Sequence, residues 1–147
     1  MVLADSNFLL ALVLDRHPFH AVVRSWLGKQ PPAKTIVLCR ATQQSFLRLL
    51  TTKAVMEPYG VAAMTNRAAW SLHEQILAES SFEWAKEPAG LDAQWKKWSR
   101  GDRSSPKLWM DAYLAAFAMT GGYELVTTDS AFRQFTGLKA VILSKSS

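Results

Sequence analysis

Residues 35–50 read TIVLCRATQQSFLRLL, and this stretch decides the fold. Its first five residues are all apolar or β-branched, which is typical of a short strand buried on both faces. The residues that follow, 42–51, place their apolar side chains at helical spacing and predict an amphipathic helix. A buried strand that runs straight into such a helix is the repeating unit of a parallel sheet covered by helices.

The same unit recurs on both sides of this stretch. Further strands are expected at residues 1–4, 81–86, 124–128 and 140–143. Helices are expected at residues 8–13, 21–27, 65–80, 91–99, from Ser105-Pro106 to 119, and at 129–135, with a loop at 58–60. This alternation predicts a single α/β domain over residues 1–147, with a central, mostly parallel sheet flanked by helices on both faces.

Composition narrows the class of protein. A chain of 147 residues has the usual length of one domain. With 49% hydrophobic and 20% charged residues, it is neither disordered nor collagen-like. Its single cysteine, Cys39, cannot close an intrachain disulfide, so a disulfide-rich secreted scaffold is excluded and a reducing cytoplasm is expected.

Charge and hydropathy indicate the kind of partner. The net charge of +5 and the pI of about 9.6 favour polyanions or acidic proteins. No apolar run approaches the roughly 18 residues of a membrane span, so no membrane partner is expected. The first apolar run, at residues 8–14, lacks a preceding basic stretch, and we therefore expect no signal peptide.

Two aspartates follow predicted strands. Asp5 comes directly after the first strand, and Asp129 follows the strand at 124–128. Both would lie at carboxyl ends of parallel strands, where open α/β sheets form their ligand sites. Each also precedes a predicted helix, so each is equally well read as a helix N-cap.

A third aspartate, Asp111, lies within a predicted helix. Most of its neighbours one and two turns away are apolar, so its carboxylate emerges from an apolar stripe and requires a cation or hydrogen-bond donors. One partner would be Lys107, one turn earlier. The other would be a divalent metal shared with Asp5 and Asp129, because a hard cation such as Mg²⁺ or Mn²⁺ relieves the repulsion between carboxylates.

Four segments together resemble the signature segments of a known family. They are LADSN at 3–7, TQQSFLRLLT at 42–51, MDAYLAA at 110–116 and LVTTDSAF at 125–132. In this order they resemble PIN domains, and more narrowly the VapC-type ribonuclease toxins of bacterial type II toxin–antitoxin pairs. The resemblance implies a PIN-like α/β/α fold and a Mg²⁺- or Mn²⁺-dependent endoribonuclease acting on RNA. It also implies a homodimer that is neutralised by a cognate VapB-type antitoxin.

The resemblance assigns roles to individual residues. Asp5, Asp111 and Asp129 match the acidic metal-site positions; Asp5 and Asp111 would ligate the metal directly, and Asp129 would ligate it or hold a water on it. Asn7 matches the polar residue after the first aspartate, and Thr127 or Thr128 matches the hydroxyl before the last. Gln43 departs from the family's usual Glu. An amide cannot take a proton as a general base, so Gln43 would orient a water on the metal.

Two other functions remain open because of these departures. With Gln43 in place of Glu, the chain could be a catalytically weak PIN-like module that binds RNA or protein. A phosphotransfer enzyme with Asp5 as nucleophile, like haloacid-dehalogenase-like phosphatases, is less favoured, because that class has Asp where Asn7 stands.

Several other residues could carry chemistry but have simpler interpretations. His17 and His20 could form a metal pair but are better read as solvated or capping; His73 is expected at the surface, and Cys39 as a buried small side chain. The stretch at 95–100 combines tryptophans with cations that could line an RNA path. We expect its tryptophans, Trp95 and Trp98, to pack on the core.

A bound antitoxin is expected to cover an apolar groove and to direct a charged or polar group at the acidic site. A cationic group would pair there with Asp5 and Asp111. Phe46 and Leu50 either contribute to that groove or belong to the core.

Overall fold

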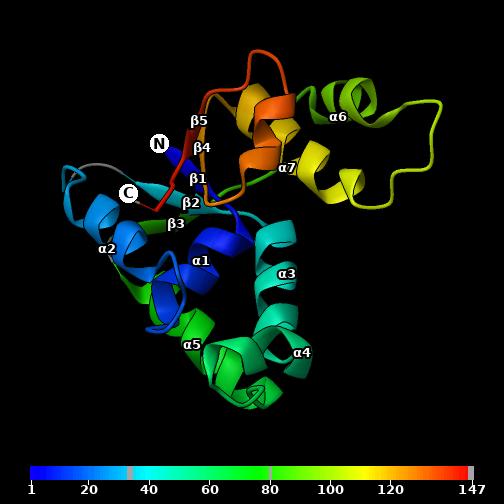
Figure 1. Cartoon of the computed structure of the whole chain (residues 1–147). Coiled ribbons are helices and arrows are strands. Elements are labelled where there is room, and N and C mark those ends of the chain that lie inside the picture. The colour runs from blue at the N-terminus through cyan, green and yellow to red at the C-terminus, as the bar shows by residue number, and fades with distance from the viewer. Residues whose placement is uncertain (33–34, 80, 146–147) are drawn as a thin grey trace.

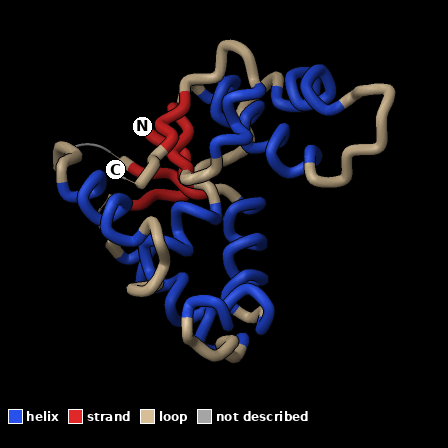
Figure 2. The backbone as a smooth tube through the Cα atoms, viewed as in Figure 1, coloured by secondary structure: helices blue, strands red, loops and turns tan. Residues whose placement is uncertain are grey.

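A computed structural model describes residues 1–32, 35–79 and 81–145. Its centre is a five-stranded sheet in which every pairing is parallel (Figures 1 and 2). The strands, in spatial order β3-β2-β1-β4-β5, are β3 (Phe82–Trp84), β2 (Ile36–Leu38), β1 (Val2–Ala4), β4 (Glu124–Thr127) and β5 (Ala140–Ile142). The predicted α/β architecture with a parallel sheet is confirmed.

Helices connect the strands and cover both faces of the sheet. Those before β3 are α1 (Ser6–Val13), α2 (His20–Gly28), α3 (Arg40–Leu50), α4 (Lys53–Met56), the 3-10 helix η1 (Glu57–Tyr59) and α5 (Asn66–Ala78). Those after it are α6 (Leu91–Ser99), α7 (Leu108–Gly121) and the 3-10 helix η2 (Ser130–Gln134). Figure 1 shows α6, the loop that follows it and the start of α7 standing out from the body of the molecule. No helix in the described ranges is long and apolar enough to cross a membrane.

Alternating side chains divide the core between the two faces of the sheet. Val2 and Ala4 of β1 pack with buried residues of α1, α2, α3 and α5. Leu3, between them, packs on the opposite side with residues of α6, α7 and η2. This alternation is the period of two that a strand imposes, and it explains why the central strands β1 and β2 are apolar throughout.

The strand order reverses between β1 and β4, which is where open parallel sheets form a crevice at their carboxyl ends. From β1 the chain adds β2 and β3 on one side, and then returns to add β4 and β5 on the other. Ala4 pairs with Val126, and the N–H of Asp5 donates to the carbonyl of Val126 at 3.3 Å. Adjacent carboxyl ends at such a reversal are where open α/β sheets bind ligands.

Local structure corrects several sequence-based expectations. The helix expected from Ser105 begins instead at Leu108, whose N–H donates to the Ser105 carbonyl at 3.1 Å; a Ser-Pro pair initiates a turn as readily as a helix. The loop expected at 58–60 largely belongs to η1, preceded by the short helix α4. The long helix expected over 65–80 ends at Ala78, and Ser80 lies outside the described residues.

Candidate active site

Asp5 connects β1 to α1 and is almost completely buried, with 2% of its surface exposed. Its Oδ1 accepts the Phe8 N–H at 2.8 Å, so it is the N-cap of α1. Its Oδ2 accepts the Thr127 hydroxyl at 2.6 Å. The capping interpretation is therefore correct, but it uses only one oxygen, and the other ties the carboxylate to the end of β4.

Thr127 joins the first and last aspartates. While its hydroxyl donates to Asp5, the same oxygen accepts the N–H of Asp129 at 2.9 Å. Asp129 caps η2 by accepting the Ala131 N–H at 2.9 Å. Of the two threonines that the sequence offered, Thr127 is the one hydrogen-bonded to both residues.

Asp111 lies in the first turn of α7 and is half-buried. It forms no ion pair with Lys107 in the part of the chain that the structure describes. The N-terminal turn of a helix favours a negative charge, which partly compensates the carboxylate. The ion pair with Lys107 that the sequence suggested is therefore not observed among the described residues. The charged groups that interact with Asp111 are Asp5 and Asp129.

The three carboxylates influence one another. Burial raises the pKa of Asp5 from 3.8 to about 7; hydrogen bonds from Thr127 and Phe8 oppose this rise, and the charges of Asp129 and Asp111 add to it. Burial and then the charge of Asp129 raise the pKa of Asp111 to about 6. The ends of β1 and β4 and the start of α7 therefore bring three acidic groups together, and within the described ranges none of the three forms an ion pair.

A hard divalent cation fits the chemistry of this site. Carboxylate oxygens are the ligands that Mg²⁺ and Mn²⁺ prefer, and a cation would reverse the raised pKa values of Asp5 and Asp111. Within residues 1–32, 35–79 and 81–145, however, no group of three His, Cys, Asp or Glu side chains is placed to hold a metal ion. The aspartates would have to draw closer together around the ion.

Gln43 has a different set of contacts. Its side chain is buried, and its Oε1 accepts Nη1 of Arg40 at 2.6 Å. The Arg40 guanidinium in turn lies 4.6 Å from the centre of the Trp84 ring. Among the described residues Gln43 makes no hydrogen bond to an aspartate. The structure thus brings Asp5, Asp111 and Asp129 together but directs the amide oxygen of Gln43 toward Arg40.

Other side chains tie α3 to the acidic site. The Thr42 hydroxyl donates to the carbonyl of Ala4 at 3.0 Å, one residue before Asp5. The Ser45 hydroxyl donates to that of Ser6, one residue after Asp5, at 2.9 Å. The sequence analysis gave neither residue an individual role; the signal was their spacing of three, which places both on one face of the helix.

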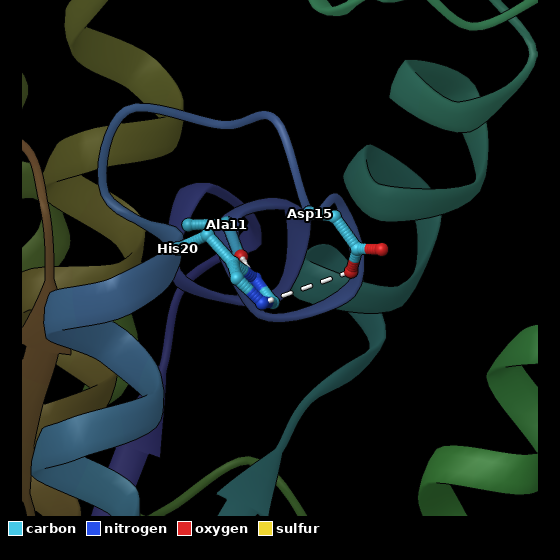
Figure 3. A network of polar contacts seen from close by, with 3 residues as sticks. All are labelled: Ala11, Asp15 and His20. Atoms are coloured by element: carbon cyan, nitrogen blue, oxygen red, sulfur yellow. Dashed lines mark hydrogen bonds and ion pairs between the residues drawn. The ribbon is translucent and has the colours of Figure 1, made fainter.

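His17 and His20 do not form a metal pair. His20 donates from Nδ1 to the Ala11 carbonyl at 2.8 Å, and its Nε2 lies 3.7 Å from Asp15, as Figure 3 shows. Nδ1 of His17 accepts the Phe19 N–H at 3.0 Å, and its ring stacks on Tyr59. Each imidazole is thus used locally, as the simpler interpretation expected.

The prediction that His73 lies at the surface is wrong. Its side chain is 1% exposed, and among the described residues neither ring nitrogen has a hydrogen-bond partner. The ring packs near Phe46 and Trp70. Ala69, His73 and Ile76 form the buried stripe of α5, and this spacing was the signal in the sequence.

The remaining expectations concern the burial of a cysteine, of two apolar residues of α3 and of two tryptophans of α6. Cys39 is a buried small side chain, as predicted. Phe46 and Leu50 are completely buried, so they belong to the core and line no groove. Trp95 and Trp98 pack against the core beneath α7, as expected.

Comparison with known proteins identifies the family. The PIN domain family model matches residues 2–138. The chain belongs to the PIN domain family. Within that family it is similar to Ribonuclease VapC41 of Mycobacterium tuberculosis H37Rv, at 48% identity over 99% of this chain and 100% of the relative. Ribonuclease VapC44 of the same organism is 31% identical over 88% of this chain and 86% of its own.

Solved structures share the fold of this PIN-domain chain. VapBC-1 from nontypeable Haemophilus influenzae aligns with a TM-score of 0.68 at 14% identity, covering 97% of this chain and 98% of the other. VapC20 of Mycobacterium tuberculosis, described as a sarcin-ricin loop cleaving toxin, aligns with a TM-score of 0.65 at 18% identity, covering 94% and 96%. The resemblance to VapC ribonuclease toxins that the sequence motifs indicated is confirmed.

Proposed function

We propose that this VapC-family ribonuclease is an endoribonuclease toxin that cleaves RNA with Mg²⁺ or Mn²⁺ held by Asp5, Asp111 and Asp129. The observation that carries the proposal is the convergence of these three carboxylates at the sheet crevice, with the pKa of Asp5 raised to about 7 and that of Asp111 to about 6. Perturbed acids in a crevice of this kind are typical of functional sites. Oxygen donors lacking a counter-charge fit a hard divalent cation.

The protein's own residues determine how the cation would be held. When bound, a divalent cation neutralises charge at the phosphate and makes a water more acidic. Asp5 is fixed in orientation, because Phe8 and Thr127 donate to its two oxygens. Thr127 also sets the position of Asp129 through its backbone N–H. Asp5 and Asp111 must lose their protons to ligate, so binding is coupled to proton release.

Gln43 is assigned a positioning role in this proposal. Because its Oε1 is occupied by Arg40, the Nε2 amino group is the part left to donate. A donor beside an acidic site can orient a water or a phosphate oxygen, but it cannot serve as a general base. Arg40 thereby fixes which end of the amide is presented to the substrate.

The proposed partner is a VapB-type antitoxin. A solved structure with the same fold is the VapBC-1 protein of Haemophilus influenzae. A groove of about 620 Å³ between α1, α2 and α5 offers an apolar floor that includes Leu12, Leu72 and Ile76. We propose that an antitoxin segment covers this groove and directs a cationic group toward Asp5 and Asp111. Co-expression with the neighbouring gene product tests this: absence of a stable complex would contradict it.

Family membership also supports proposals for the domain count, the oligomeric state and the cellular location. Residues 1–147 are assigned to one domain, acting on RNA as a homodimer in the cytoplasm. Analytical ultracentrifugation of the purified chain tests the dimer, and a monomer at micromolar concentration would overturn it.

The nuclease is tested by cleavage of total RNA, with RNA ends sequenced after brief incubation with Mg²⁺ or Mn²⁺. Wild type should cut at defined internal positions, and Asp111→Asn should cut at least about a hundredfold more slowly. Asp15→Asn, at an exposed aspartate in the turn after α1, is the matched control and should cut as wild type does. Full cleavage by Asp111→Asn in EDTA would eliminate the metal-dependent mechanism.

One observation favours a weaker alternative. Gln43 adds no charge to the site, and its amide oxygen is taken by Arg40, so the acidic set consists of three carboxylates. A site with weak metal affinity would leave a module that binds RNA without cutting it. RNA binding by wild type with no cleavage at millimolar Mg²⁺ or Mn²⁺ would favour this alternative.

A further inference from the structure

A pocket with three aromatic side chains in its wall lies at the start of α7, the helix that also carries Asp111. It has a volume of about 400 Å³ and is lined by Ala41, Trp95, Pro106, Trp109, Met110 and Tyr113. The starts of α3 and α7, the helix α6 and the loop before α7 contribute its walls. The sequence analysis singled out neither Trp109 nor Met110.

Two helices, α3 and α7, connect this pocket to the acidic site. Trp109 and Met110 directly precede Asp111 in the first turn of α7. Ala41 directly precedes Thr42, whose hydroxyl donates to the carbonyl before Asp5. A group held in the pocket therefore lies within one turn of Asp111 along α7, on a different face of the helix from the carboxylate.

Two rings of the pocket, those of Trp95 and Tyr113, pack edge-on and have their polar atoms engaged in hydrogen bonds. Trp95 stands edge-on to Trp109 and Tyr113, with ring centres 6.4 and 5.4 Å apart. Nε1 of Trp95 donates to the Trp109 carbonyl at 3.0 Å, and the Tyr113 hydroxyl donates to Glu87 at 2.7 Å. These groups leave ring surfaces to a ligand and offer little hydrogen bonding to its edges.

Exposure and charge both indicate a ligand that is flat and anionic. Trp109 is 58% exposed and Met110 is 42% exposed, although large apolar side chains are normally buried. Residues 91–107, which form α6 and the loop before α7, make up an arm beside the pocket. The arm has two exposed acidic residues, Asp92 and Asp102, and five exposed cations: Lys96, Lys97, Arg100, Arg103 and Lys107. None of the five forms an ion pair within the described ranges. Aromatic faces among cations are the pattern by which proteins bind single-stranded nucleic acid.

We propose that this pocket is a base-stacking subsite that holds one nucleobase of single-stranded RNA next to the phosphate that is cut. The inference rests on the proposed nuclease function and names the part of the substrate that the site recognises beyond its phosphate. Trp109 supplies the stacking face, and the cations of the arm hold the flanking phosphates. Because the polar atoms of Trp95 and Tyr113 are engaged and Trp109 presents its ring, the pocket selects bases by stacking area, and it binds purines more tightly than pyrimidines.

The test measures binding without cleavage. A 12-residue oligoadenylate and a 12-residue oligouridylate, both single-stranded RNA, are titrated in EDTA with fluorescence anisotropy as the readout. Wild type should bind the oligoadenylate more tightly. Trp109→Ala should weaken that binding about tenfold, and Trp109→Phe should restore most of it. Trp70→Ala removes a similarly exposed tryptophan (48%) on α5, away from the pocket, and should bind as wild type does.

The possible outcomes separate this inference from the nuclease itself. Equal oligoadenylate binding by Trp109→Ala and wild type, with thermal melting showing that both are folded, would overturn the subsite whether or not the protein cleaves RNA. A wild-type dimer that becomes a monomer in Trp109→Ala, by light scattering, would also overturn it by making the patch a contact between copies. Stacking that depends on Trp109 in a protein that never cleaves RNA would uphold the subsite and refute the nuclease.

Discussion

Asp5 and His73 are both buried titratable side chains, but their surroundings are opposite in kind. Asp5 accepts two hydrogen bonds and has two acidic neighbours, and burial raises its pKa to about 7. His73 has no hydrogen-bond partner in the part of the chain that the structure describes; it packs near Phe46 and Trp70, and burial lowers its pKa. Glu74 opposes that decrease and Arg40 adds to it. Burial thus disfavours the charged form at both places.

The difference lies in what each site can do with the charge. Asp5 has other carboxylates as neighbours, and together they can bind a cation. A bound cation would favour the deprotonated, charged form of Asp5. Among the described residues no group is hydrogen-bonded to the His73 ring, and Glu74 only partly offsets the effect of burial, so His73 behaves as a core residue with an unsatisfied polar group. The two groups also give opposite pH dependence: acidification relieves the cost of burying Asp5 and creates a cost at His73.

The largest expected change in stability is at Asp5. The pKa is 3.8 in the unfolded chain and about 7 in the folded one, so the folded state binds more protons between these values, and metal-free stability falls as the pH rises through that window. Asp5→Asn keeps a good N-cap and removes the charge. In EDTA at pH 8 it should be more stable than wild type by on the order of 2–4 kcal/mol.

Urea unfolding at pH 5 and pH 8 measures this difference. The advantage of Asp5→Asn should shrink at pH 5, where Asp5 is already protonated in the folded wild type. Asp102→Asn, at an exposed position, is the control and should change the free energy of unfolding by less than about 0.5 kcal/mol. Equal stability of wild type and Asp5→Asn at both pH values would mean that Asp5 carries no electrostatic cost.

A smaller change is expected at His73. Removing an unsatisfied buried polar group in favour of an apolar one is stabilising, so His73→Leu should raise the free energy of unfolding by about 1–2 kcal/mol at pH 7.5. Because the pKa is lowered in the folded state, wild type should lose stability as the pH falls below 6.5, and the gap should widen at pH 5. Gln75→Leu, on the exposed side of the same helix, is the control in the same unfolding measurement. A variant less stable than wild type at both pH values would show that His73 has an essential partner.

The smallest change is expected at Gln43. A carboxylate placed there would pair with Arg40, which already donates to the Gln43 oxygen at 2.6 Å. Gln43→Glu alone should therefore alter Mn²⁺ affinity by less than about threefold, and stability by less than about 1 kcal/mol. Adding Arg40→Ala should free the new carboxylate and tighten Mn²⁺ binding, as measured by calorimetry. A tenfold gain in the single variant would place position 43 directly on the acidic cluster.

The fold and the acidic cluster could be read from local patterns. Strands such as Ile36–Leu38 are short apolar runs, and aspartates directly after two of them had to lie at one edge of a parallel sheet. Asp111 could be identified as a candidate site residue because a carboxylate in an apolar stripe requires a cation or hydrogen-bond donors. Family resemblance added the expectation of a metal-dependent ribonuclease.

What the sequence missed depends on contacts between distant segments. The hydrogen bond from Thr127 to Asp5 joins residues 122 positions apart, and no spacing rule predicts it. The helix α4 has four residues, too few to show a period. His73 was placed at the surface because His and its neighbour Glu74 are polar, although the helix buries that stripe. Trp109 was overlooked because an exposed tryptophan is not expected from hydropathy.

Metal binding by Asp5, Asp111 and Asp129 is tested most directly by calorimetric titration of Mn²⁺ at pH 7 in two buffers of different protonation enthalpy. Wild type should bind Mn²⁺ and release protons, because Asp5 and Asp111, with pKa values of about 7 and about 6, hold part of their protons at that pH without metal. Asp5→Asn should lose at least about tenfold in affinity together with most of the proton release. Equal Mn²⁺ affinity and equal proton release in wild type and Asp5→Asn would contradict the account.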